Sequence, residues 1–207
     1  MKKRNPILLF AVFTILSFTA FAQKGSGFGI KAGLNYGQNG DLIEYTGTAA
    51  EDIIQGSKGK IGYHFGIFGK LDLPSVYVRP ELIYTKTSSS YDINGTSSNY
   101  DVSKLDLPLL VGFKVIGPLH VFAGPAFQYM LENNLENFTI NDAEKDFTVG
   151  LHLGAGVNLG KLGFDVRYEK GFSDNEANFV SDNITTNING KVDSRPSQII
   201  FAVSLKL

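Results

Sequence analysis

Apolar and polar residues alternate along most of the chain after about residue 26, with the period of two that is typical of β-strands. In one segment, Phe164, Val166 and Tyr168 occupy one parity and Asp165 and Arg167 the other. In the body of such segments, charged residues and histidines fall on the polar parity. We predict eight strands, over residues 27–36, 61–71, 76–87, 103–115, 119–130, 147–159, 162–170 and 198–207.

The connections between these segments are alternately short and long. The short ones are rich in Gly, Pro, Asp and Ser and cover residues 72–75, 116–118 and 160–161. The long ones are polar and cover residues 37–60, 88–102, 131–146 and 171–197. This pattern is typical of an outer-membrane barrel. The predicted fold class is therefore all-β: an eight-stranded antiparallel up-and-down transmembrane β-barrel with short periplasmic turns and long extracellular loops.

Parity alone does not decide which face points outward. A soluble periplasmic ligand-binding calyx would turn the apolar face inward and leave the charges in water. Two observations favour lipid outside: the segments are long enough to cross a bilayer when tilted, and the body of the apolar face carries no charge. The third observation is that six strands each place an aromatic residue at the same level near their outer end, as an interfacial girdle requires. The predicted girdle is Tyr36, Tyr63, Tyr84, Tyr129, Phe147 and Tyr168.

The first 22 residues have the pattern of a secretory signal peptide. A basic start is followed by an apolar run over residues 7–21 and by the small-x-small site Ala20-Phe21-Ala22. The alternative, a retained membrane anchor, fits less well because the run is short and no basic flank follows it. We predict cleavage after Ala22, export to the outer membrane, and a barrel domain over residues 23–207.

Composition narrows the function classes. The chain has 207 residues and no cysteine, which excludes a disulfide framework and thiol chemistry. Without the three basic residues of the signal peptide, 16 basic residues face 20 acidic ones. A nucleic-acid-binding protein would normally be basic, so we expect no nucleic-acid partner.

The inward face of the predicted barrel carries ionisable residues of both signs. Eight strands leave an interior that side chains fill, so no open pore is expected. Buried charges need partners, so we predict a charge-paired plug in which Arg79 and Arg167 satisfy Glu81, Asp165 and Glu169. The alternative is an acid/base pair or ion path through the same groups. The predicted lumenal network is Lys31, Arg79, Glu81, Asp106, Asp165, Arg167 and Glu169.

Enzymatic and metal-binding interpretations find little support. His64, His120 and His152 share the inward parity, but their predicted heights differ too much for one zinc ion. The predicted lipid face and long loops lack a histidine that could act as a catalytic base. No nucleophile-elbow, P-loop or zinc-protease motif occurs. We therefore predict no enzymatic activity, no metal site and no cofactor.

The long loops are where binding specificity is expected. Residues 48–54 form an acidic, partly amphipathic piece with the capping-box spacing between Thr48 and Glu51, which predicts one or two helical turns. The asparagine-rich stretch over residues 175–189 is predicted to be a solvated polar loop, because its spacing fits no EF-hand.

Four segments resemble the PorT type of small outer-membrane β-barrel domain of Gram-negative bacteria. They are residues 80–84 (PELIY), 105–110 (LDLPLL), 123–125 (AGP) and 165–171 (DVRYEKG). The resemblance spans nearly the whole mature chain and implies an OmpA-like eight-stranded transmembrane barrel. The eponymous member is associated with a secretion and gliding-motility apparatus, and we do not transfer that role on these motifs.

These observations predict a monomeric structural or interaction protein of the outer membrane, with a plugged polar lumen. Its expected partners are outer-membrane lipid and proteins of the cell envelope, such as those of a secretion or surface assembly. The two alternatives are a small channel or transporter and the soluble periplasmic calyx.

Overall fold

The computed structural model describes residues 26–38, 42–45, 53–55, 58–93, 96–135, 138–140, 147–172, 176–181, 189–193 and 197–207. The predicted signal peptide lies outside the described residues. Eight long strands cover the predicted segments: β1 (Gly27–Gln38), β4 (Lys58–Asp72), β5 (Tyr77–Ile93), β6 (Thr96–Lys114), β7 (Leu119–Leu135), β9 (Phe147–Leu159), β10 (Leu162–Gly171) and β13 (Ser197–Lys206). None of the described residues belongs to a helix that could span a membrane.

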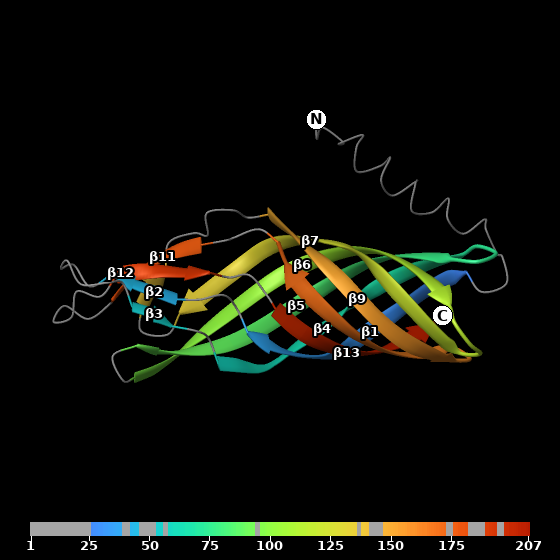
Figure 1. The fold of residues 1–207 in the computed structure, drawn as a ribbon, viewed down its shortest axis with the longest axis horizontal. Coiled ribbons are helices and arrows are strands. Elements are labelled where there is room, and N and C mark those ends of the chain that lie inside the picture. The colour runs from blue at the N-terminus through green and yellow to red at the C-terminus, as the bar shows by residue number, and fades with distance from the viewer. Residues whose placement is uncertain are drawn as a thin grey trace, which may run out of the picture.

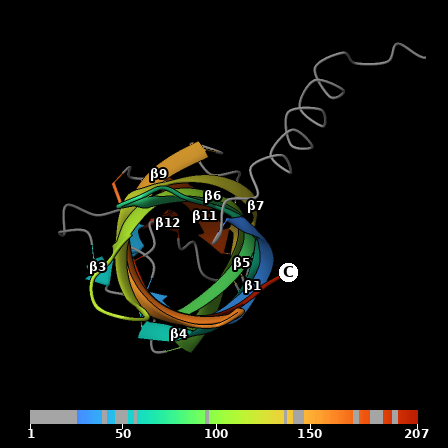
Figure 2. The ribbon, with the colours of Figure 1, turned by 90° about the vertical axis from the view of Figure 1, so that its right-hand side faces the viewer.

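The eight long strands form a closed antiparallel barrel. Each pairs with the next along the chain, and β1 closes the ring by pairing with β13 from Gly29↔Lys206 to Gln38↔Ser197. Figure 2 shows the ring seen along the barrel. The predicted fold class, an eight-stranded up-and-down barrel, is confirmed.

The wall of the barrel is apolar outside and polar inside. Burial alternates residue by residue, most regularly along β10. Phe28, Leu109 and Val203 are exposed on the outer surface, whereas Arg167 in the lumen is 3% exposed. The calyx alternative is therefore wrong, because it requires the apolar face to line the interior.

The two ends of the barrel differ. At the short-turn end, the strands are joined by residues 73–76, 115–118 and 160–161. Gly160 adopts φ +65°, which a two-residue hairpin such as Gly160-Lys161 favours at its first position. At the long-loop end, β5 and β6 continue far past the predicted strand ends and pair up to Ile93↔Thr96. The prediction of a polar loop over residues 88–102 was therefore wrong.

Five short strands extend the sheet at the long-loop end. They are β2 (Leu42–Tyr45), β3 (Ile53–Gln55), β8 (Phe138–Ile140), β11 (Glu176–Ser181) and β12 (Asn189–Asp193). They continue the sheet from β7 in the order β8, β11, β12, β2, β3, and Figure 1 shows β2, β3, β11 and β12 together at this end. The predicted helical piece over residues 48–54 is contradicted at its end, because Ile53 and Ile54 lie in β3; residues 48–52 lie outside the described residues. Part of the predicted solvated loop over residues 175–189 is likewise strand.

Glycines on the inner wall make room for large lumenal side chains of the neighbouring strand. A Cβ atom at Gly33 would lie 2.6 Å from Cε1 of His64, its cross-strand partner. A Cβ atom at Gly154 would lie 2.6 Å from Cζ of its partner Phe122. Both distances are too short for real contacts, so the alternation of glycine with large residues is a packing requirement of this narrow lumen.

Candidate functional site

The first of two ion clusters in the lumen is built around Arg167 of β10. Its guanidinium donates to Glu81 at 2.9 Å (Nη1 to Oε2) and to Asp165 at 2.8 Å (Nη2 to Oδ1). Lys31 of β1 lies with its Nζ 3.1 Å from Glu81 Oε1 and 3.1 Å from Asp165 Oδ2. Arg79 of β5 places Nε 2.9 Å from Glu81 Oε1 and Nη2 3.5 Å from Asp165 Oδ2. We call these five residues the arginine cluster; three cations surround two carboxylates.

The second cluster is built around Glu169, also of β10. Lys104 Nζ of β6 lies 2.5 Å from Glu169 Oε1 and 3.3 Å from Asp106 Oδ1. The Glu169 carboxylate also accepts hydrogen bonds from Gln128 at 2.6 Å and Gln198 at 2.9 Å. We call Lys104, Asp106, Glu169 and their neutral partners the lysine cluster; one cation faces two carboxylates.

His152 of β9 connects the two clusters. Its Nδ1 lies 3.4 Å from Arg167 Nη1, and its Nε2 lies 3.0 Å from Glu169 Oε2. A guanidinium can only donate, so in the neutral imidazole this contact requires Nδ1 to accept and Nε2 to donate to Glu169. The hydrogen-bonded network therefore runs unbroken from one cluster to the other.

The charges of the two clusters balance as a whole. Their four cations and four carboxylates are all buried. Unpaired charges in this setting would be strongly unfavourable, and pairing with additional hydrogen bonds is what makes their burial possible. The lumen needs no bound counter-ion to remain neutral.

An aromatic floor supports the arginine cluster toward the short-turn end. The guanidinium carbons of Arg79 and Arg167 lie 4.7 and 5.1 Å from the centroid of the Phe122 ring, within cation–π range. His120 stacks on the Phe122 ring with the centroids 5.9 Å apart, and Tyr77 meets His120 edge-on at 5.7 Å. Tyr77, Leu110 and Phe122 form a buried apolar cluster that fills the barrel at this level.

A cavity of about 10 Å³ lies between the two clusters, with Lys31, Asp106, His152 and Arg167 among its lining residues. His64 also lines it, and neither ring nitrogen of this buried side chain has a hydrogen-bond partner among the described residues. A space of this size holds one water molecule, which could satisfy the imidazole. It is too small to serve as a substrate pocket.

All seven predicted network residues face the lumen, but their pairing differs from the prediction. The arginines contact Glu81 and Asp165, whereas Glu169 is paired with Lys104, two glutamines and a histidine. Sequence reasoning left Lys104 out of the network, although its inward parity was the signal that could have identified it. No group of three His, Asp or Glu side chains in the described part of the chain is arranged to hold a metal ion.

Five of the six predicted girdle residues are exposed on the outer wall, and Tyr84 is half-buried against Phe65. The strand register aligns several of them. Tyr36 and Tyr168 both pair with Ile199 of β13, from opposite sides. In the same way, Tyr84 and Tyr129 both pair with Leu105 of β6.

This chain matches the model of a known protein family. The model of the outer membrane protein beta-barrel domain matches residues 21–176. No curated protein matches the sequence.

Several solved structures are similar to this one. Neisserial surface protein A matches with a TM-score of 0.50 at 11% identity, over 89% of this chain and 100% of that one. Ail of Yersinia pestis, solved with the heparin analogue sucrose octasulfate, has a TM-score of 0.43 at 9% identity, with the same coverage of both chains. Outer membrane protein W of E. coli has a TM-score of 0.41 at 14% identity, again over 89% and 100%. At such low identity, the likeness to Neisserial surface protein A shows the fold alone.

Proposed function

Because this chain belongs to the outer membrane protein β-barrel domain family, we propose that it spans the outer membrane as a closed barrel with a charge-paired plug. The short turns face the periplasm and the long-loop end faces outward, as is usual for such barrels. The observation that carries the proposal is the ion network in the lumen. Its four cations and four carboxylates are paired with one another and balance in charge. A channel would need a continuous aqueous path past these groups.

Ion conduction is the test of the plug. The mature protein, refolded and inserted into a planar bilayer, is expected to give no reproducible current steps, while a porin in the same bilayer conducts. Gel mobility of heated and unheated samples should verify that the inserted protein is folded. Reproducible ion-selective steps would contradict the plug and favour the alternative, a small channel.

We propose a structural or interaction role for the barrel, without catalysis. Each carboxylate of the network is engaged by ion pairs, and the cavity beside it holds no more than a water molecule. The surface that remains for binding is the long-loop end, which the five short strands enlarge into an extended sheet. We infer that this end engages an envelope partner, as part of a secretion or surface assembly.

A pull-down from detergent-extracted native envelope, analysed by mass spectrometry, tests the partner. A variant in which a short Gly-Ser loop replaces residues 173–196 removes β11 and β12 and should lose the partner, while its barrel still folds. Retention of the same partner by this variant would show that the long-loop sheet is not the interface.

We further propose that the chain is of the PorT type. This placement is supported by residues 80–84 and 165–171, which supply Glu81, Asp165 and Arg167 of the arginine cluster. The segments that carry the resemblance thus contain residues of the plug. A PorT-type relative in which these positions are replaced by apolar residues, with the lumen still closed, would weaken the link.

A further inference from the structure

The three short turns expose aliphatic side chains where turns in water would be polar. Ile116 is 75% exposed, the highest value of any large apolar residue described. Leu73 lies at the tip of the first turn, and Leu159 and Leu162 flank the third; all three are exposed. A single exposed leucine needs no explanation, but the same feature at each short turn forms a patch that marks an interaction surface.

This apolar patch continues the lipid-facing wall without a break. Val115 follows the exposed Val111 and Phe113 on the outer face of β6, and Leu162 precedes the exposed Phe164 on β10. Among the described residues on the outer face of β6 and β10, no polar side chain lies between these turn positions and the exposed apolar residues of the wall. The apolar outer surface of the barrel wall therefore extends over the short turns.

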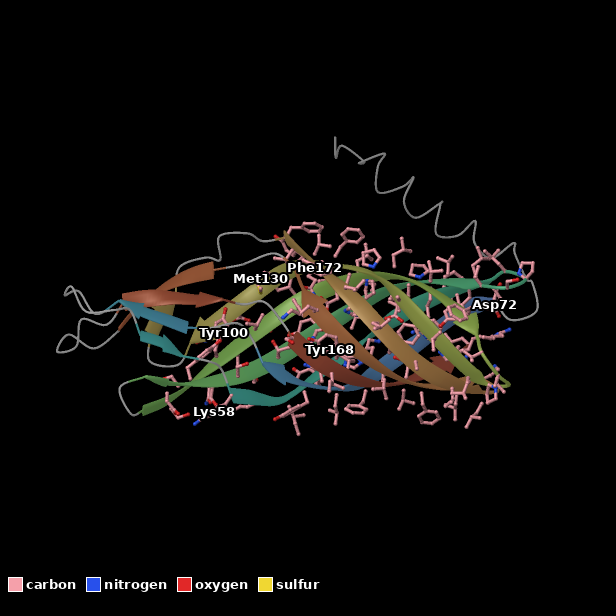
Figure 3. All side chains as sticks on the ribbon, viewed as in Figure 1. Lys58, Asp72, Tyr100, Met130, Tyr168 and Phe172 are labelled. Carbon is pink, nitrogen blue, oxygen red and sulfur yellow. The ribbon has the colours of Figure 1, made fainter. Side chains whose placement is uncertain are left out.

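Lysines border the patch. Lys70, Lys114, Lys161 and Lys206 all lie at the short turns or the adjoining strand ends. Among the described residues of this end, Asp72 is the single acidic side chain; it is buried and lies 3.0 Å from Lys70 and 3.9 Å from Lys114. Figure 3 labels Asp72 at this end of the barrel. The short-turn end thus combines aliphatic tips with an excess of positive charge.

We propose that the short turns are seated in the headgroup region of the periplasmic leaflet, where Lys114 and Lys161 bind the phosphate groups of anionic phospholipids. Aliphatic tips gain by leaving water, and lysine stems can lie along apolar surface while the ammonium reaches the headgroups. Anionic lipid attracts basic residues at a membrane surface. This inference rests on the proposed transmembrane role and orientation.

Because the chain contains no tryptophan, a single introduced one reports depth without background. Ile116→Trp places the probe at the second turn, Leu107→Trp on the lipid-facing wall and Ser97→Trp on the β5–β6 hairpin at the long-loop end. Each variant is refolded into phosphatidylcholine–phosphatidylglycerol vesicles and quenched by brominated lipid and by aqueous iodide. We expect brominated lipid to quench the probes at 116 and 107, and iodide to quench the probe at 97.

The outcomes separate two failures. If the probe at 107 is not quenched by brominated lipid, the proposed transmembrane role is wrong. If the probe at 107 is quenched by lipid but the probe at 116 is quenched by iodide, the barrel spans the bilayer and the turns project into water, which overturns the present inference alone.

Lipid selectivity tests the lysines. In equimolar vesicles, we expect brominated phosphatidylglycerol to quench the Ile116→Trp probe about two- to fivefold more efficiently than brominated phosphatidylcholine. Adding Lys114→Gln and Lys161→Gln should bring this ratio close to unity. The matched control adds Lys58→Gln and Lys170→Gln, which remove the same charge from the long-loop end and should leave the ratio unchanged. Equal quenching by both lipids before substitution, or a ratio that survives the loss of Lys114 and Lys161, would show that these lysines do not bind phosphate.

Discussion

The arginine and lysine clusters solve the same problem, the burial of carboxylates, in different ways. Glu81 is held by three cations, from Lys31, Arg79 and Arg167. Glu169 is held by one cation, Lys104, with glutamines and a histidine completing its hydrogen bonds. The first cluster has an excess of positive charge and the second an excess of negative charge.

Because of this difference, we expect the two clusters to respond unequally to the removal of one charged side chain. In the arginine cluster, each charge is compensated by other charges, so removing one carboxylate leaves several cations facing one another. In the lysine cluster, neutral donors also stabilise the carboxylates, so a carboxylate that loses its cation still accepts hydrogen bonds. The two clusters are joined through His152, so the unequal response can be measured within one molecule.

The largest effect is expected for Glu81→Gln. Glutamine has the shape of glutamate but no charge, so the three cations of the arginine cluster are left with one carboxylate, that of Asp165. Leaving buried charges uncompensated should lower the free energy of unfolding by about 3–5 kcal/mol. Urea titration in lipid vesicles, followed by circular dichroism, measures the change.

Glu132→Gln is the matched control, because Glu132 is an exposed residue of β7. An exposed charge contributes little to stability, so this variant should unfold like the parent protein. Equal unfolding of Glu81→Gln and Glu132→Gln would show that the arginine cluster contributes nothing to the plug.

A smaller loss is expected for Lys104→Met. Glu169 then keeps its bonds to Gln128, Gln198 and His152, and Asp106 keeps a 2.6 Å hydrogen bond from Thr85. The free energy of unfolding should fall by about 1.5–3 kcal/mol, the range for a hydrogen bond to a charged group.

A double-mutant cycle sharpens this prediction. Adding Glu169→Gln to Lys104→Met removes both charges of the closest pair, so the double variant should be more stable than the sum of the two losses predicts. Strict additivity, measured by the same urea titration, would mean that the two side chains do not interact.

The sequence could predict the barrel because its determinants are local. Alternation along each strand fixes which residues share a face, strand length and the level of the aromatics favour lipid outside, and the Gly-Lys turn at 160–161 fixes a tight hairpin. The composition of the lumen followed from the same parity, which placed Arg79, Glu81 and Arg167 on one face. What sequence could not give was the partner of each charge, since the register and curvature of the closed sheet decide that Glu169 meets Lys104 and not an arginine.

The long-loop end was predicted least well for a related reason. Its short strands are held by pairing between segments far apart in the chain, such as β12 with β2. Strands of three to six residues are too short to show a clear local alternation of apolar and polar residues. The extension of β5 and β6 past residues 87 and 103 was missed because this stretch is rich in Ser, Asn and Asp; Asn and Asp are depleted in strands, and the stretch has few apolar residues to mark a face.

Phe122→Leu should destabilise the arginine cluster by removing its aromatic support. The ring contacts both guanidinium groups, and leucine offers them no π-face. We expect the free energy of unfolding to fall by about 1–2 kcal/mol. Phe127→Leu on the same strand is the control, because Phe127 stacks on Phe147 and contacts no cation of the network. A larger loss for Phe127→Leu than for Phe122→Leu would argue that the cation–π floor is unimportant.

The smallest effect is expected for Gln198→Met, and its combination with a second change is the informative part. Glu169 loses one donor at 2.9 Å but keeps Lys104, Gln128 and His152. Because three donors still hold the carboxylate, the free energy of unfolding should fall by about 1 kcal/mol, below the usual range for a hydrogen bond to a charged group. If the neutral donors together stabilise the Glu169 carboxylate, the double variant Gln198→Met and Gln128→Met should lose more free energy of unfolding than the sum of the two single losses. The reason is that the second removal leaves lone pairs of a buried carboxylate without a donor. Simple additivity in urea titration would mean that each glutamine acts alone, and that the lysine cluster, like the arginine cluster, depends on charge.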